Sequence, residues 1–267
     1  MFPDYHCHTN LCGHASGEME DYIAAALLKG LQELGFSDHL PMYWLPESER
    51  NPGLAMSEQE LPLYVEKVIK LQKKYSDLSI KLGIEADYIP GNNMELNRLL
   101  EMYPFDYVLG SVHFVNGWAV DSPANKNDYE HLNIDEIYTD YFSYLQIADR
   151  SGLFNIMAHP DLIKKFGYRP KKNLASLYEQ TAEIFAKSGV CAEVNTAGLR
   201  YPAREIYPSL ELLRLFKKYG VAVTVGSDAH FPEQVGEDWE EAALYLKEAG
   251  YRETAVFSGR RLKMVKI

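Results

Sequence analysis

The chain has 267 residues, 46% of them hydrophobic, and its 27 basic and 38 acidic side chains give a net charge of −11. This length suits one large core, and an α/β barrel of about 250 residues fits as a single domain. The acidic balance argues against nucleic-acid binding by phosphate neutralisation. Three cysteines do not suggest a disulfide framework, and the sequence has no signal-like start or membrane-length apolar run, so we expect a cytoplasmic protein.

Predicted strands and helices alternate along the whole chain. Short apolar runs bounded by turn residues predict strands, and apolar residues spaced three and four apart predict the helices between them. The alternation is typical of parallel strands with crossover helices, and at this length it predicts one βα barrel domain over residues 1–267. The predicted strands are a first one starting near Asp4, then 36–41, 79–87, 106–113, 154–159, 190–196 and 221–227; the predicted helices are 17–35, 62–75, 94–102, 134–150, 173–188, 208–219 and 238–249.

Two segments depart from this alternation. Residues 42–56 contain Pro46, Pro52 and Gly53, and they predict an irregular excursion of the kind that often forms a functional lid. Residues 254–257, together with 262–267, predict a last strand or a sheet edge.

The segment from Asp4 to His14, DYHCHTNLCGH, places three histidines at the end of the first strand. Alternate side chains of an extended strand share a face, so His6 and His8 point the same way and Cys7 points the other way. Two imidazoles on one face can bind one metal ion, and His14 lies in a loop that can turn back towards them. Such a pair alone is more often an ordinary structural feature, so its interpretation depends on the other histidines.

Seven of the eight histidines, together with two carboxylates, come at or just after the C-terminal end of a predicted strand. These ends meet at the C-terminal mouth of a parallel barrel, where such folds place their chemistry. Imidazole and carboxylate donors suit zinc, iron or manganese. Because nine donors are too many for one ion, we expect a cluster of two or three ions. The predicted ligands are His6, His8, His14, His39, Glu85, His113, His159, Asp228 and His230, with Glu85 or Asp228 bridging.

Six motifs follow one another over nearly the whole chain: DYHCHTNLCGH, FSDHLP, GIEADY, GSVHF, MAHPD and GSDAH. In these motifs the sequence resembles the polymerase and histidinol phosphatase (PHP) family, with every ligand position present. The resemblance implies a distorted seven-stranded βα barrel that holds three divalent ions, which are zinc, iron or manganese. It assigns one ion to His6, His8, Glu85 and Asp228, a second to Glu85, His113 and His159, and a third to His14, His39 and His230.

Within that family, the length, the excursion after SDHLPM and the run DYVLGSVHFVNGWAVDSP are most similar to stand-alone histidinol-phosphate phosphatases. This similarity implies a phosphomonoesterase of histidine biosynthesis that converts L-histidinol phosphate to L-histidinol and phosphate, by attack of a metal-bridging hydroxide. The metal motifs do not select the substrate, so a nucleoside phosphate or an oligonucleotide end is the alternative. More distant alternatives are a non-catalytic metal-stabilised module and an amide or ester hydrolase.

Five residues are predicted to act on the substrate or in catalysis. Glu85, Asp228 and His230 are the metal-holding members of this set. Arg200, in the loop after the sixth strand, is the predicted bidentate contact to phosphate. Lys164 is predicted to bind the substrate as well, together with Arg200. The expected partner is therefore a small phosphorylated molecule, with neither nucleic acid nor membrane involved, and the protein is expected to be a monomer or a small homo-oligomer.

The acid that protonates the leaving alkoxide stays open at the level of sequence. Asp161, Asp38 and His230 are the candidates, because each lies at a strand end near the predicted metal ligands. Arg169 and Arg204 are weaker candidates for a phosphate contact.

Overall fold

Two parallel sheets form the centre of the computed structural model, which describes residues 3–267, so residues 1–2 of the predicted domain lie outside it. The first sheet has the order β1-β2-β3 and the second has the order β10-β9-β8-β5-β4. Their strands are β1 (Pro3–Cys7), β2 (Glu33–Phe36), β3 (Ser79–Leu82), β4 (Glu85–Asp87), β5 (Leu109–Ser111), β8 (Ile156–Met157), β9 (Cys191–Asn195) and β10 (Val223–Gly226).

Isolated parallel bridges join the two sheets into a barrel. Cys7 at the end of β1 pairs with Ala229 beyond β10, and His39 beyond β2 pairs with Glu85 at the start of β4. β3 and β4 form one run that is interrupted only at residues 83–84. The barrel therefore has seven strand positions, which confirms the predicted distorted (β/α)7 barrel.

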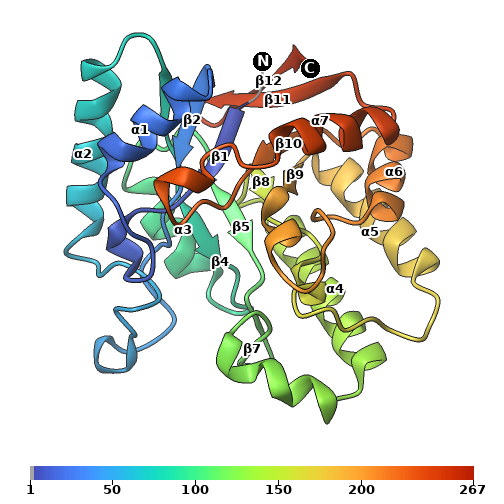
Figure 1. Ribbon diagram of the computed structural model, residues 1–267. Coiled ribbons are helices and arrows are strands. Elements are labelled where there is room, and N and C mark those ends of the chain that lie inside the picture. Colours follow the sequence, from blue (N-terminus) through green and yellow to red (C-terminus); the bar gives the residue numbers. More distant parts are fainter. Residues whose placement is uncertain (1–2) are drawn as a thin grey trace.

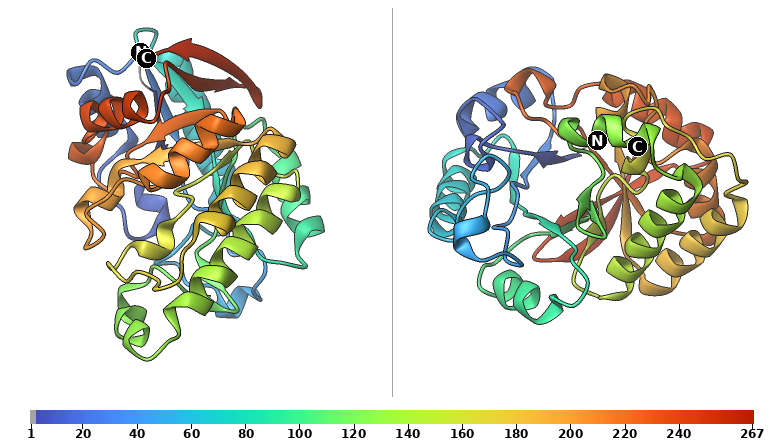
Figure 2. Two further views of the ribbon diagram at one scale, coloured as in Figure 1. Left: turned by 90° about the vertical axis from the view of Figure 1, so that its right-hand side faces the viewer. Right: turned by 90° about the horizontal axis from the view of Figure 1, so that it is seen from below.

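Helices surround the barrel, as the view along its axis shows (Figure 2). Most of them begin and end close to their predicted bounds, because their apolar stripes follow the helical period. They are α1 (Met19–Leu28), α2 (Leu61–Lys74), α3 (Asn93–Glu101), α4 (Ile134–Arg150), α5 (Ala175–Ser188), α6 (Leu210–Tyr219) and α7 (Trp239–Glu248).

The predicted helix 17–35 is wrong at its C-terminal end, and the predicted strand 36–41 begins too late. α1 ends at Leu28, and Gly30 adopts a φ of 72° that stops the helix. Leu34, which also fits the helical period, belongs to β2 instead. Over so short a segment, helical spacing and strand alternation select the same apolar residues.

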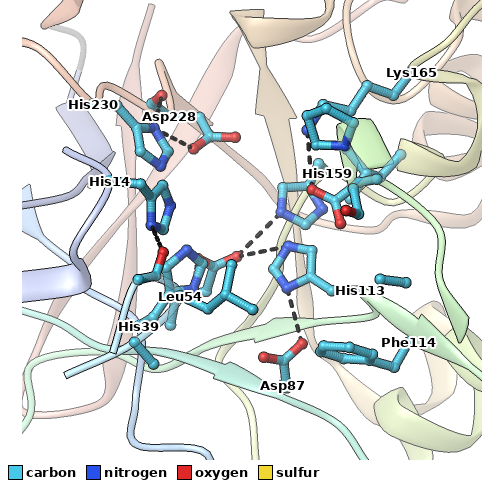
Figure 3. Close-up of a pocket in the computed structure, with 18 of the residues that line it drawn as sticks. His14, His39, Leu54, Asp87, His113, Phe114, His159, Lys165, Asp228 and His230 are labelled. Carbon is cyan, nitrogen blue, oxygen red and sulfur yellow. Dashed lines mark hydrogen bonds and ion pairs between the residues drawn. The ribbon is translucent and has the colours of Figure 1, made fainter. Parts of the chain in front are cut away.

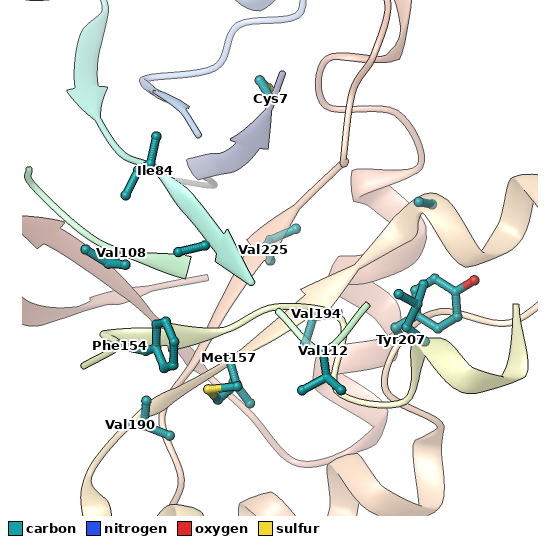
Figure 4. Packing of buried hydrophobic residues seen from close by; sticks show 14 of the residues in the cluster. Cys7, Ile84, Val108, Val112, Phe154, Met157, Val190, Val194, Tyr207 and Val225 are labelled. Carbon is teal, nitrogen blue, oxygen red and sulfur yellow. The ribbon is translucent and has the colours of Figure 1, made fainter. Parts of the chain in front are cut away.

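Outward-facing strand residues and the helices share one buried core. Val194, Val225 and Met157 belong to this cluster (Figure 4). Helix residues such as Phe216 belong to it as well. Inside the barrel, the ring of Tyr107 occupies the space beside Gly83, where an added Cβ would lie 2.2 Å from the Tyr107 Cζ atom. Glycine is required there because a large interior side chain fills the barrel.

A hairpin covers the end of the barrel at which the strands begin. It consists of β11 (Glu253–Ser258) and β12 (Arg261–Lys266), which pair antiparallel and confirm the predicted last strand or edge. Figure 1 shows the hairpin beside the start of β1. At the opposite end, a second small hairpin, β6 (Phe114–Val115) and β7 (Trp118–Ala119), follows β5. Among residues 3–267, none of the helices has the length and apolar character needed to cross a bilayer.

Candidate metal centre and its cavity

All nine predicted ligands lie together at the C-terminal mouth of the barrel. A cavity of about 440 Å³ opens there, and seven of the nine side chains line it. His6 and His8 lie behind them, fully buried at the end of β1. Figure 3 shows the imidazole rings pointing towards one another from several strand ends. The seven in the cavity wall are His14, His39, Glu85, His113, His159, Asp228 and His230.

Glu85 lies at the centre of this cluster. It begins β4, where the bridge to His39 draws the two sheets together, and Ser111 donates a hydrogen bond to its Oε1 atom. Its carboxylate faces five imidazoles, so it can bridge neighbouring ions. The nitrogen-to-oxygen distances are 3.0 Å to His39 Nδ1, 3.1 Å to His159 Nε2, 3.3 Å to His6 Nε2, 3.5 Å to His8 Nε2 and 3.6 Å to His113 Nε2.

Asp228 provides the second carboxylate, from just beyond β10. Its backbone has a φ of 54°, in the left-handed region. Its Oδ1 atom lies 3.3 Å from His8 Nε2, 3.6 Å from His230 Nδ1 and 3.7 Å from His6 Nε2. Glu85 and Asp228 therefore both face the His6 and His8 rings, and the binding of one ion by these four residues stays a prediction.

His14, His39 and His230 form the outer side of the cluster. The ring centroids are 4.8 Å apart for His14 and His230 and 5.4 Å apart for His14 and His39. The excursion over residues 42–56 holds His14 in place, because the His14 Nδ1 atom lies 3.1 Å from the carbonyl oxygen of Gly53. The loop predicted as a lid thus contacts one of the predicted ligands.

The donor atoms fit divalent metal ions. His6 Nε2, His8 Nε2 and Glu85 Oε2 are buried and have no hydrogen-bond partner among residues 3–267. These three side chains offer donor atoms that all lie within 4.8 Å of one another. An unsatisfied buried polar atom destabilises a fold by about 1–3 kcal/mol. A bound ion would satisfy all three atoms at once, and nitrogen and oxygen donors suit a zinc-type ion.

The negatively charged carboxylates and the positively charged imidazoles of this cluster stabilise each other. Burial alone would raise the pKa of Glu85, but His6, His39 and His113 hold that pKa well below its usual range. Burial would likewise lower the pKa of His113, but the Asp87 carboxylate raises it to about 10. The site is therefore arranged for anionic carboxylates facing positive charge, whether that charge is a proton or a metal ion.

The cavity wall also carries an ion pair, between Asp121 and Lys165, that was not predicted from the sequence. Asp121 and Lys165 form an ion pair of 3.0 Å, and the Lys165 ammonium lies 4.5 Å from the centroid of the Tyr201 ring. Leu54 and Phe114 also line the cavity and add apolar surface to it. Asp121 is part of the quoted run DYVLGSVHFVNGWAVDSP, which was the one signal available for it.

Arg200 lies next to the metal cluster but is held by neighbouring protein groups. Its Nη2 atom donates to the carbonyl oxygens of Ser227 at 2.7 Å and Asp228 at 3.1 Å, and its Nη1 atom pairs with Glu237 at 3.1 Å. The structure therefore gives Arg200 a clear role in fixing the Asp228 backbone. Its direct contact with phosphate stays a prediction.

Lys164 is buried, with 3% of its side chain exposed, and its ammonium pairs with Asp161 and Glu205 at 2.9 Å each. Arg169 also pairs with Glu205, at 3.2 Å, and Arg204 donates to a backbone carbonyl at 3.1 Å. Of the two neighbouring lysines, Lys165 is the one that lines the cavity. Substrate binding by Lys164 stays a prediction.

The barrel and the cluster at its mouth define a metal-binding barrel of the hydrolase class. The PHP domain family model matches residues 4–197, and a PHP-associated model matches residues 211–244. The chain belongs to the PHP domain family.

Similar proteins cover nearly the full length of this chain. A probable histidinol-phosphatase of Deinococcus radiodurans is 37% identical over 97% of this chain and 98% of its own length. A histidinol-phosphatase of Bacillus subtilis is 30% identical over 89% of this chain and 96% of its own length. The crystal structure of histidinol phosphate phosphatase from Lactococcus lactis, complexed with zinc, L-histidinol and phosphate, is 25% identical, with a TM-score of 0.83 over 98% of both chains.

Proposed function

We propose that this protein is a metal-dependent phosphomonoesterase that hydrolyses L-histidinol phosphate to L-histidinol and phosphate. The observation that carries the proposal is the 37% identity to a probable histidinol-phosphatase over 97% of this chain. The buried donor cluster beside a cavity of about 440 Å³ supports it, because the chemistry requires metal donors next to space for a small molecule.

The nine side chains would hold three divalent ions, zinc, iron or manganese, in the groups that the family resemblance implies. When bound, such ions activate a water molecule as nucleophile and neutralise charge on the phosphate oxygens. Glu85, at the centre of the cluster, would connect neighbouring ions. The Arg200 guanidinium, which donates to the Asp228 carbonyl oxygen at 3.1 Å, would hold Asp228 in the cavity wall.

We propose that different side chains of the cavity wall bind the phosphate, the ammonium group and the imidazole of the substrate. The phosphate would lie against the histidine cluster, with the Lys165 ammonium beside it. The carboxylate of Asp121, paired with Lys165 at 3.0 Å, would attract the ammonium group of histidinol. Phe114 and Leu54 would pack on the imidazole, since flat rings favour apolar and aromatic neighbours.

His230 is the leaving-group acid that the cavity geometry favours. It lines the cavity, whereas Asp161 is buried beside Lys164 and also accepts a hydrogen bond from the Ser209 backbone at 2.8 Å. Asp38 is buried as well, and Thr9 donates a hydrogen bond to it. An acid must reach the departing oxygen, and for this reason we propose His230 rather than either aspartate.

The test is steady-state phosphate release from L-histidinol phosphate beside nucleoside monophosphates and sugar phosphates, on protein of measured metal content. We expect kcat/KM to favour histidinol phosphate by several hundredfold, about 3 to 4 kcal/mol of transition-state binding. Equal rates across the panel would overturn the substrate and leave a general phosphatase. No phosphate release from fully metal-loaded protein would overturn the enzymatic function itself.

A further inference from the structure

Glu193 is a fully buried carboxylate on β9, behind the metal cluster rather than in it. Its Oε1 atom lies 2.8 Å from Nδ1 of His6. A carboxylate oxygen accepts a hydrogen bond, so this contact places a proton on Nδ1. The opposite ring nitrogen, Nε2, is then left with a free lone pair. That nitrogen faces Glu85 at 3.3 Å and Asp228 at 3.7 Å.

The second oxygen of Glu193 holds another predicted ligand. Its Oε2 atom accepts a hydrogen bond from the backbone N–H of His159 at 2.8 Å and from the Asn195 side chain at 2.9 Å. The backbone of His159 has a φ of 28°, which is unusual for a residue with a side chain. Through this contact, Glu193 supports the conformation in which His159 Nε2 lies 3.1 Å from Glu85.

The neighbouring strand makes room for this arrangement. A Cβ atom at Gly226 of β10 would lie 2.1 Å from Glu193 Oε1 and 2.6 Å from the Cβ of His6. Any larger residue would push these two side chains apart. Glycine at this position therefore fits a site in which the contact between Glu193 and His6 must be preserved.

His113 shows the same pattern on the other side of the cluster. Its Nδ1 atom lies 2.9 Å from Asp87, and its Nε2 atom faces Glu85 at 3.6 Å. Carboxylates that orient metal-binding imidazoles in this way fix the ring tautomer and strengthen the ligand. Glu193 differs from Asp87 because it contacts two ligand residues instead of one.

We propose that Glu193 is the positioning residue that prepares His6 and His159 together for metal binding. It fixes the His6 tautomer that presents Nε2 and holds the His159 backbone, so that loss of one carboxylate disturbs two ligand groups. This inference rests on the proposed metal site. It does not depend on the substrate.

The first test compares zinc binding to metal-free wild-type, Glu193→Gln and Asp149→Asn proteins by chelator competition. Glutamine keeps the size of Glu193 but can offer an acceptor to only one of its two ligand partners. We expect zinc affinity to fall about 10- to 100-fold. Asp149→Asn is the matched control, because Asp149 is a buried carboxylate on α4 whose side chain bonds with Ser188, away from the cluster. Glu193→Gln with wild-type affinity would overturn the proposal.

A second measurement needs no folded variant. Nitrogen-15 NMR of the metal-free wild-type protein at high pH reports which ring nitrogen of each neutral histidine carries the proton. We expect His6 to be protonated at Nδ1, and a His6 protonated at Nε2 would overturn the proposal. Failure of histidinol phosphate hydrolysis alone would leave both readouts unchanged, so the two proposals fail separately.

Discussion

The two ends of the barrel bury polar groups in opposite ways. At the covered end, the hydroxyl of Tyr5 donates to Glu33 and accepts from the Phe257 backbone at 2.8 Å, while the Tyr107 hydroxyl donates to the Tyr5 carbonyl at 2.7 Å. At the mouth, His6, the next residue on β1, leaves its Nε2 atom without a partner among the described residues. Neighbouring residues of one strand thus serve opposite purposes.

The difference between the ends separates stability from function. Protein groups complete the hydrogen bonds at the covered end, so that end can be rigid without a ligand. At the mouth, the imidazoles and carboxylates would be completed by the proposed metal ions. Substitutions at the covered end should therefore change the free energy of unfolding, whereas substitutions at the mouth should change metal content and turnover.

Glu85→Gln should give the largest effect on activity. The substitution removes the negative charge that five imidazoles face, and kcat/KM should fall at least about a thousandfold, or about 4 kcal/mol. Steady-state phosphate release and metal analysis of the same sample test this prediction, with Tyr5→Phe as the matched control at the covered end. If Glu85→Gln keeps the activity and metal content of the wild type, the proposed division between a functional mouth and a stabilising covered end is wrong.

Removal of metal by a chelator should abolish activity and lower the melting temperature of the wild-type protein. Metal that binds the folded state at a hundred times its Kd stabilises that state by about 2.7 kcal/mol. Differential scanning fluorimetry before and after addition of zinc or manganese measures the change. Activity that persists in metal-free protein would contradict the proposal that metal ions bound at the mouth are needed for catalysis.

The sequence predicted which histidines and carboxylates meet at the mouth because the fold itself brings strand ends together. His113 and His159 are far apart in the chain, yet both follow a parallel strand, so their meeting follows from topology. Glu193 was missed because one acidic residue within VCAEVNT has no spacing that marks it, and its role depends on which side chains β9 faces. Lys165 was missed because the two neighbouring lysines point in different directions from an irregular turn, which sequence alone cannot resolve.

Tyr5→Phe should destabilise the protein and leave turnover unchanged. Phenylalanine fills the same volume, but Glu33 and the Phe257 N–H each lose a buried partner, so the free energy of unfolding should fall by about 1–3 kcal/mol. Urea unfolding monitored by circular dichroism measures the free energy of unfolding. Steady-state kcat/KM on metal-loaded protein measures the effect on turnover. A large loss of kcat/KM with unchanged stability would mean that the covered end also takes part in function.

Asp121→Asn should sharpen the description of the mouth by separating substrate recognition from metal chemistry. Loss of the carboxylate should raise KM for histidinol phosphate about tenfold, or about 1.4 kcal/mol. It should change KM little for p-nitrophenyl phosphate, which has no ammonium group. Lys165→Met is the comparison, because loss of its charge should weaken binding of both phosphates. Equal effects of Asp121→Asn on the two substrates would contradict the proposed ammonium contact.

Asp149 shows that an unpartnered buried oxygen is not enough to define a metal site. Its Oδ2 atom has no partner among the described residues, yet burial raises its pKa to about 6, whereas the histidines lower the pKa of Glu85. The folded state therefore retains the Asp149 proton to a higher pH than the unfolded chain, whose aspartates titrate near about 3.9. This contribution to stability is complete below about pH 4 and is lost as the pH rises through about 6.

The substitution Asp149→Asn prevents this loss of stability at high pH, because the asparagine side chain cannot ionise. Asp149→Asn should raise the free energy of unfolding by about 1–2 kcal/mol at pH 8, and the difference from wild type should vanish near pH 4. Urea titrations at several pH values test this dependence. A constant difference at every pH would mean that packing, rather than ionisation, distinguishes the two side chains. Metal affinity should stay at its wild-type value, because the site at the mouth depends on several donors facing one another.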